Sequence, residues 1–195
     1  MPRHDQLSLF VDETPASLPP GVSYFSDVLA PQDEERAAAA IAQLDLKPFA
    51  FHGFEGNRRV TSFGWRYDFN GGGLQRTKPI PEFLEPLRST AAEVAGLSPS
   101  DLEHVLVSEY SPGAGIGWHK DRPQFGTIVA LSLLAPCRLR FRRKVGDAWK
   151  RRSHIVEPRS AYILAGEGRD EWEHSIPPME VLRYSLTFRT MRKRA

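Results

Sequence analysis

Short apolar runs fill the second half of this chain, and they restrict the folds that it can adopt more than any other feature. Each run is a few residues long and is flanked by charged or turn-forming residues, as β-strands are. From about residue 104 onward the runs are 104–110, 127–134, 138–141, 153–156, 161–164 and 181–189. Gly146 and Asp147 lie between two alternating segments, which predicts a hairpin tip there.

Two helices are expected ahead of these strands. Pro31, followed by acidic residues and an alanine-rich stretch, is typical of a helix start, and this helix should continue to Leu44. A second helix fits residues 81–95, with Gly96 as its stop. Because helices come first and strands follow, we expect an α+β fold, a sandwich or jelly roll backed by N-terminal helices, without alternating βαβ units.

Length and composition favour one folded domain and a short tail. The chain has 195 residues, of which 41% are hydrophobic and 26% charged, as in an average soluble protein. Residues 1–20 end in a proline pair followed by Gly21, so we expect a flexible tail and then a domain over residues 21–195. The sequence has no secretory signal and no stretch of about 18 apolar residues, which predicts a cytoplasmic protein with no membrane span.

A pair of candidate metal ligands lies in the segment GWHKD. His119 and Asp121 are two residues apart, so on an extended chain both side chains leave the same face and can bind one ion. The single cysteine excludes a cysteine-based zinc cage and fits a reducing compartment. His174 in DEWEHSIPP is the best third ligand. Two histidines and one carboxylate suit non-haem iron(II), although zinc also binds such ligands. The competing histidines are His52, His104 and His154, of which His104 and His154 fit ordinary strand positions.

The last predicted strand has two unlike faces. Apolar residues alternate there with a polar set, which is Arg183, Ser185, Thr187 and Arg189. On a surface strand this polar set would face solvent. Alternatively, two guanidinium groups can bind the two carboxylates of a dicarboxylate in bidentate fashion, with hydroxyls bonded to the remaining lone pairs. Together with the metal pair, the strand suggests an anionic co-substrate.

Three segments together resemble the AlkB family of nucleic-acid dealkylating oxygenases: VSEYSPGAGIGWHKD, GEGRDEWEHSIPP and RYSLTFR. The resemblance covers roughly residues 20–192 and implies a double-stranded β-helix, or jelly roll. By matching positions, it implies that iron(II) is held by His119, Asp121 and His174.

The same resemblance implies a binding site for 2-oxoglutarate. Tyr110 and Arg183 would lie at the distal carboxylate, and Arg189 at the carboxylate nearer the metal. Many relatives carry asparagine where this chain has Ser108 and Ser185. Both departures shorten a polar side chain near the co-substrate, but they leave the charged groups intact, which should contribute most of the binding.

The enzyme implied by the resemblance is a dioxygenase that uses iron(II), 2-oxoglutarate and O2, with ascorbate as an added reductant in vitro. Such enzymes hydroxylate a methyl carbon on a base nitrogen, and the product loses formaldehyde. The expected role is repair of alkylation damage, with DNA as the favoured substrate. The alternatives are the same chemistry on tRNA or a protein side chain, a non-catalytic nucleic-acid-binding module, and a zinc hydrolase.

An aromatic stripe in RRVTSFGWRYDF is a candidate surface for a base. Four rings alternate with other residues and would share one face of a strand: Phe63, Trp65, Tyr67 and Phe69. Core packing is the commoner meaning of such a stripe. The nearby Arg58, Arg59 and Arg66 favour a base-binding lid, because charge beside stacked rings is suited to a nucleic-acid backbone. The residues assigned to the substrate are Trp65, Arg66 and Tyr67.

Basic residues gather between positions 138 and 152, although the formal net charge of the whole chain is only +2. Such a cluster could neutralise phosphates, and a solvated arginine-rich hairpin is an equally good interpretation. The cluster comprises Arg138, Arg140, Arg142, Arg143, Lys144, Lys150, Arg151 and Arg152.

The segment QLSLF near the start resembles the short peptide by which bacterial replication and repair proteins dock on the DNA polymerase sliding clamp. A peptide in a flexible tail can extend into a groove with apolar anchors, whereas the alternative is a tail that packs on its own domain. The residues that carry this prediction are Gln6, Leu7, Leu9 and Phe10. A clamp-binding tail would favour DNA as the substrate.

Overall fold

The computed structural model describes residues 18–51, 54–68 and 73–192. The helices in this part of the chain are α1 (Pro31–Ile41), α2 (Glu85–Val94) and α3 (Gly166–Asp170), with short 3-10 turns η1 (Glu82–Leu84) and η2 (Pro99–Asp101). The strands are β1 (Val22–Phe25), β2 (Lys47–Phe51), β3 (Phe54–Phe63), β4 (Trp65–Asp68), β5 (Gly73–Arg76), β6 (His104–Tyr110), β7 (Ile116–His119), β8 (Phe125–Leu133), β9 (Cys137–Val145), β10 (Ala148–Val156), β11 (Ser160–Leu164), β12 (Glu173–Ile176) and β13 (Arg183–Met191).

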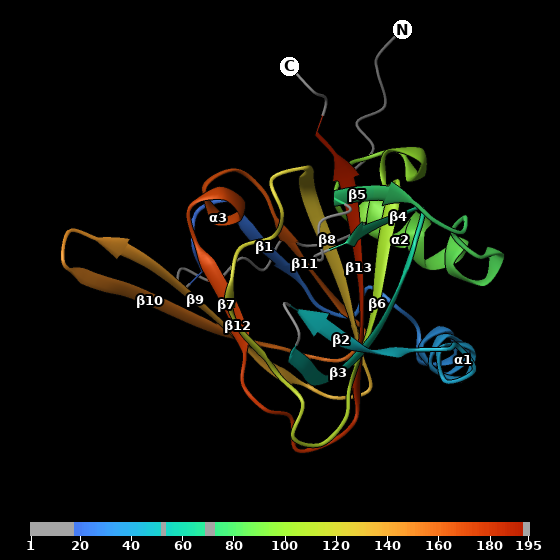
Figure 1. The fold of residues 1–195 in the computed structure, drawn as a ribbon. Coiled ribbons are helices and arrows are strands. Elements are labelled where there is room, and N and C mark those ends of the chain that lie inside the picture. Colours follow the sequence, from blue (N-terminus) through green and yellow to red (C-terminus); the bar gives the residue numbers. More distant parts are fainter. Residues whose placement is uncertain (1–17, 52–53, 69–72, 193–195) are drawn as a thin grey trace, which may run out of the picture.

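Two antiparallel sheets form the body of the protein (Figure 1). The larger, seven-stranded sheet has the order β1-β11-β8-β13-β6-β3-β2, and the smaller, four-stranded sheet has the order β10-β9-β12-β7. Strands that are neighbours in space are often distant in the sequence, since β13 lies between β6 and β8. This arrangement confirms the predicted jelly roll with helices at one side.

Apolar side chains pack on both faces of the larger sheet. Helices α1 and α2 cover one face, where Ile41, Leu87 and Leu186 are buried in one cluster. The second cluster lies between the two sheets and includes Ile128 from β8 and Phe141 from β9. Burying one such side chain contributes about 1.5–3 kcal/mol, so these two layers hold the sheets in a fixed relation to each other.

The predicted hairpin tip at Gly146 and Asp147 is confirmed. β9 and β10 pair without interruption from Cys137 opposite Val156 to Val145 opposite Ala148. Both strands extend beyond the predicted apolar runs, because their outer halves carry alternating charged residues. Figure 1 shows this hairpin reaching out from the body of the protein.

The predicted aromatic stripe does not lie on one strand, and this part of the prediction is wrong. β3 ends at Phe63, and Gly64 takes a left-handed backbone with φ of 79°. A side chain would not fit there, because a Cβ on Gly64 would lie 2.0 Å from the Glu103 carbonyl oxygen. Phe63 therefore packs in the helix-side core, while Trp65 and Tyr67 lie on β4, which pairs only with β5 among the described strands. Phe69 lies outside the described residues.

The described part of the predicted tail packs on the domain. Leu18 is buried in the cluster between the sheets, and the Pro19 carbonyl accepts a hydrogen bond from the Val22 backbone N–H at 3.0 Å. The clamp-peptide residues Gln6, Leu7, Leu9 and Phe10 lie outside the described residues. Among the described helices, none has the length and apolar character that crossing a bilayer requires.

Candidate metal and 2-oxoglutarate site

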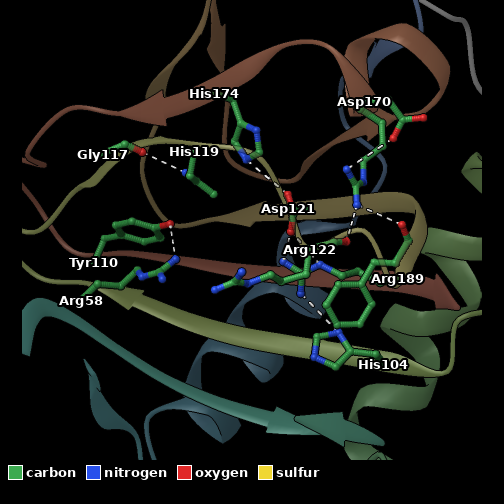
Figure 2. A network of polar contacts seen from close by, with 12 residues as sticks. Arg58, His104, Tyr110, Gly117, His119, Asp121, Arg122, Asp170, His174 and Arg189 are labelled. Carbon is green, nitrogen blue, oxygen red and sulfur yellow. Dashed lines mark hydrogen bonds and ion pairs between the residues drawn. The ribbon is translucent and has the colours of Figure 1, made fainter. Parts of the chain in front are cut away.

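The three predicted metal ligands come together between the two sheets (Figure 2). His119 ends β7 and His174 lies on β12, and the antiparallel pairing of these strands places the two residues directly opposite each other. Asp121 follows β7 by two residues, and its Oδ2 lies 3.5 Å from His174 Nε2. One ligand atom from each side chain lies within 4.8 Å of the others, which is close enough for all three to contact one ion. The competing histidines His104 and His154 are not part of this group.

The charges at this cluster suit a divalent metal. Burial, followed by the nearby His119, lowers the pKa of His174 to about 3. Burial also lowers the pKa of His119. Burial opposes ionisation of Asp121, but Arg189 and the two histidines hold its pKa well below the usual range. At neutral pH the set is therefore two neutral imidazoles and one carboxylate, which are the forms that bind metal.

A hydrogen bond fixes the ring orientation of His119. Its Nδ1 lies 2.9 Å from the Gly117 carbonyl oxygen, which can only accept, so Nδ1 carries the proton and Nε2 keeps its lone pair. Such a hydrogen bond to a backbone carbonyl commonly orients a metal-binding histidine.

Arg189 joins the carboxylate of the cluster to a buried histidine. Its Nε and Nη2 donate to Asp121 Oδ1 at 3.0 and 2.7 Å, and its Nη1 lies 3.3 Å from His104 Nδ1. Burial, followed by the charge of Arg189, lowers the pKa of His104 well below its ordinary value, so the ring is neutral and Nδ1 accepts this bond. Sequence reasoning treated His104 as an ordinary strand residue. The strand register, which places it opposite Arg189, reveals its role.

The loop after Asp121 is held by a side chain that sequence reasoning also missed. Arg169 of α3 is 4% exposed, and its Nη2 donates to the carbonyl oxygens of Arg122 and Phe125 at 2.6 and 3.0 Å. These bonds fix the chain between Asp121 and β8. No local sequence pattern predicts this contact, because α3 and the loop after Asp121 are far apart along the chain.

Arg183 is a buried cation with free donors. The side chain is fully buried, its Nε donates to Ser132 Oγ at 3.0 Å, and Nη1 and Nη2 have no hydrogen-bond partner among the described residues. The phenol of Tyr162 and the thiol of Cys137 lie near enough to sense its charge, yet burial raises the pKa of both groups. Both stay protonated, so neither supplies a counter-charge.

Two open donors on a buried guanidinium fit one end of a dicarboxylate. An unpaired charge in a protein interior costs several kcal/mol, which binding of an anion would offset. Tyr110, which is predicted at this end, and Ser185, which is predicted near the co-substrate, are 4% and 3% exposed. The Tyr110 ring lies 5.2 Å from the Arg183 guanidinium carbon. The polar face of β13 is therefore buried, which rules out the solvent-facing interpretation. The residues present fit 2-oxoglutarate.

Arg58 of β3 closes over the same region. It is 6% exposed, its Nη1 lies 3.4 Å from the Tyr110 hydroxyl, and its guanidinium lies 4.5 Å from the centre of the Phe49 ring. Sequence reasoning grouped Arg58 with the aromatic stripe as a backbone-binding arginine. Its side chain instead packs inside, above the tyrosine predicted to contact the co-substrate.

The residues predicted to contact substrate lie on the small β4–β5 ribbon. Tyr67 stacks with Arg122 at 4.5 Å, and Arg122 is the residue after Asp121, so this ring is tied to the edge of the metal cluster. Trp65 stacks with Arg76 across the ribbon at 4.4 Å. Arg66 lies between them and is exposed.

Comparison with known proteins agrees with the fold and the cluster. The family model described as the 2OG-Fe(II) oxygenase superfamily matches residues 21–189. The chain belongs to this superfamily, whose members use iron(II), 2-oxoglutarate and O2.

Individual relatives narrow this class. The chain is 28% identical over 176 residues to tRNA (carboxymethyluridine(34)-5-O)-methyltransferase alkbh8 of Xenopus tropicalis, covering 83% of this chain and 26% of that protein. It is 31% identical over 135 residues to alpha-ketoglutarate-dependent dioxygenase AlkB of Escherichia coli K12, covering 62% of this chain and 61% of the relative. The structure of OsALKBH1 aligns with a TM-score of 0.67 at 17% identity, over 89% of this chain and 99% of that one.

These matches place the protein in the AlkB family of 2-oxoglutarate-dependent dioxygenases. The chain spans only about a quarter of the alkbh8 relative and less than two thirds of AlkB.

Proposed function

We propose that this oxygenase removes alkyl groups oxidatively from nucleobases, with DNA as the substrate. The observation that carries the proposal is the stack of Tyr67 on Arg122, which ties an aromatic ribbon to the metal cluster. An enzyme that acts on a base must take it out of the helical stack or use a single strand, and aromatic rings beside the reaction centre replace the lost stacking. Likeness to AlkB, a named alpha-ketoglutarate-dependent dioxygenase, supports the reaction type.

Each polar group of the site has a place in this proposal. His119, Asp121 and His174 would hold iron(II), which with bound 2-oxoglutarate and O2 supplies the oxidation of an alkyl carbon. Arg183 would bind the distal carboxylate of 2-oxoglutarate through Nη1 and Nη2, beside Tyr110. Ser185 is buried two residues further along the same face of β13.

Arg189 has two tasks in the proposed site. It holds the Asp121 carboxylate at a fixed position and retains N–H groups for the carboxylate of 2-oxoglutarate nearer the metal. Once a hydroxyl stands on the carbon next to nitrogen, the C–N bond breaks, that carbon leaves as formaldehyde and the hydroxyl proton is released, so the chain needs no separate acid for bond cleavage at the base.

The test is turnover on defined oligonucleotides. The protein is incubated with iron(II), 2-oxoglutarate, ascorbate and single- or double-stranded DNA carrying N-methylated bases, and the oligonucleotide mass and formaldehyde are followed. We expect a methylated DNA strand to lose its methyl group with equivalent succinate formation, and His174→Ala to abolish both. If succinate formed while the mass of every methylated DNA strand stayed the same, the proposal would be contradicted.

A second candidate is the same chemistry on tRNA. It is favoured by the alkbh8 relative, whose name refers to tRNA and whose match covers more of this chain than the AlkB match does. Methylated RNA and DNA oligonucleotides of identical sequence, assayed in parallel, separate the two candidates. Stacking on Trp65 and Tyr67 does not depend on the sugar, so a preference for RNA would come from protein groups that contact the 2′-hydroxyl.

Sliding-clamp docking through residues 6–10 stays a prediction that would support DNA as the substrate. A peptide of residues 1–20 should bind the clamp of the host, and a Leu9→Ala, Phe10→Ala peptide should not. Equal binding by both peptides, or by neither, would remove this support.

A further inference from the structure

A groove lined by arginines lies on the hairpin β9–β10 and its neighbour β7, outside the predicted metal and co-substrate site. Its volume is about 490 Å³, and it is lined mainly by Trp118, Arg138, Arg140, Arg151, Arg152 and Ser153. We call it the arginine groove. The strand register places Arg138, Arg140 and Arg142 of β9 opposite Ile155, Ser153 and Arg151 of β10, so these side chains share one face of the sheet.

The arginines of the groove lack counter-charges, in contrast to their neighbours on the same hairpin. Arg142 pairs with Glu173 at 2.5 Å, and Arg143 pairs with Glu167 and Glu171. None of the four groove arginines has a carboxylate within 4.0 Å in the described parts of the chain. Arg151 also lies directly opposite Arg142, and like charges in this position are destabilising. The hairpin thus concentrates positive charge without neutralising it.

Aromatic rings interleave with the cations at this face. The Trp118 ring lies 5.1 Å from the guanidinium of Arg140 and 4.5 Å from that of Arg142. Arg142 also lies 4.3 Å from the ring of Trp149, which is 38% exposed. Arg140, which has no carboxylate partner, thus lies beside the half-buried Trp118, and the exposed Trp149 lies beside the paired Arg142. Cations interleaved with indole rings suit single-stranded nucleic acid, since phosphates bind the cations and bases stack on the rings.

The groove adjoins the metal cluster through the chain itself. Trp118 immediately precedes His119, and successive side chains of a strand leave opposite faces, so β7 presents its indole to the groove and its imidazole to the cluster. His174 in turn lies opposite Phe141 of β9. A strand bound in the groove is therefore separated from the reaction centre by the thickness of one sheet.

We propose that the arginine groove binds the phosphodiester backbone of the same DNA strand whose target base enters the metal site, on nucleotides further along the strand from that base. This inference rests on the proposed function. It assigns backbone binding to the groove and base stacking near iron to the β4–β5 ribbon. Arg138, Arg140 and Arg151, which share one face of the hairpin, supply the charge.

The test measures binding of unmodified single-stranded DNA, of about 20 nucleotides, by fluorescence anisotropy at salt concentrations from about 50 to 200 mM. Arg138→Gln with Arg151→Gln removes two groove charges. Each lost phosphate contact lowers the slope of log affinity against log salt by about 0.7, so the slope should fall by about 1.4 and the affinity at 0.1 M salt by more than about tenfold. Arg138→Lys with Arg151→Lys retains the charge and should retain the slope.

A matched control changes the same charge on the same hairpin. Lys144 and Lys150 lie toward the hairpin tip, outside the groove lining. Replacing both with glutamine should therefore change the affinity for DNA by less than about twofold. Equal losses in the two glutamine variants would overturn the inference, because general attraction would then explain binding. So would wild-type affinity in the groove variant, or competition by poly-glutamate as strong as by unlabelled DNA, which would indicate an acidic protein partner.

Failure of the two proposals is distinguishable. If the protein bound unmodified DNA through the groove but removed no methyl group from any DNA strand, the proposed reaction would be contradicted. The proposed role of the groove would be unaffected. If the protein demethylated DNA and the groove variant kept wild-type affinity for DNA, the proposed role of the groove would be contradicted. The proposed reaction would be unaffected.

Discussion

Two arginine-rich strand regions of this protein have similar sequence patterns and opposite surroundings. On β13, Arg183 and Arg189 alternate with apolar residues, and both are buried, at 0% and 7% exposure. On the hairpin β9–β10, Arg138 and Arg151 also lie in alternating segments, and both are exposed. The smaller sheet covers β13, whereas the described residues leave the hairpin face open. Alternation alone therefore tells which residues share a face, and the packing of a second sheet decides whether that face is a binding site or a surface.

The difference has an energetic consequence. A buried guanidinium without a counter-ion is costly, so it is retained where a ligand uses it, and its loss should affect one ligand strongly. Exposed arginines cost little, and each contributes a small, salt-dependent share of binding. The effects of replacing arginines in the two regions should therefore differ in size, and only the effects on the hairpin should depend on salt.

The largest effect is expected for Arg183→Met. Losing two charge-assisted hydrogen bonds, at about 1.5–3 kcal/mol each, should weaken 2-oxoglutarate binding by at least about a hundredfold. The free protein should be as stable as wild type or more stable, because the variant removes a buried charge that has open donors. Calorimetric titration and urea unfolding measure the two quantities. Arg142→Met on the hairpin is the matched control, and it should leave 2-oxoglutarate affinity unchanged.

A smaller but still large effect is expected for Arg189→Lys. Lysine offers a point charge where Arg189 now makes two hydrogen bonds to Asp121 and contacts His104, so the apparent Michaelis constant for 2-oxoglutarate should rise by more than about tenfold. Arg183→Lys should behave similarly. If steady-state kinetics gave wild-type constants for both lysine variants, the buried face of β13 would not be the co-substrate site.

A several-fold effect is expected for His104→Phe. Phenylalanine keeps the ring packed on Phe125, 4.8 Å away, but removes the Nδ1 that accepts from Arg189. Losing one hydrogen bond to a charged group, at about 1.5 kcal/mol, should raise the dissociation constant of 2-oxoglutarate roughly tenfold or less. Since His104 positions Arg189 and does not touch the substrate, the rate at saturating 2-oxoglutarate should change little. His154→Phe on β10 is the control, and an equal change there would remove the positioning role.

The smallest effect is expected on the exposed side of the comparison. Arg142 and Glu173 form an ion pair with side chains 24% and 28% exposed. A double-mutant cycle with Arg142→Gln and Glu173→Gln should give a coupling free energy of about 0.2–1 kcal/mol in urea unfolding. A coupling of several kcal/mol would mean that the hairpin is held as rigidly as the interior.

The sequence was sufficient for the parts of the site that depend on local spacing. His119 and Asp121 are two apart on an extended segment, and the alternation of β13 predicted which residues accompany Arg183 and Arg189. The contacts of His104 and Arg169 were not predictable, because they depend on strand register and on a helix packed against a distant loop. The aromatic stripe was misread as one strand because an alternating pattern does not reveal that Gly64 breaks it.

The most direct test of the central claim is an anaerobic calorimetric titration of 2-oxoglutarate into the iron(II)-loaded protein, with wild type, His174→Ala and Arg183→Met compared. If one site uses the metal cluster and the buried arginine together, wild type should bind one equivalent. The affinity should fall at least about a hundredfold without metal, in His174→Ala and in Arg183→Met. Equal affinity in all three proteins, or binding that does not depend on iron(II), would contradict the account.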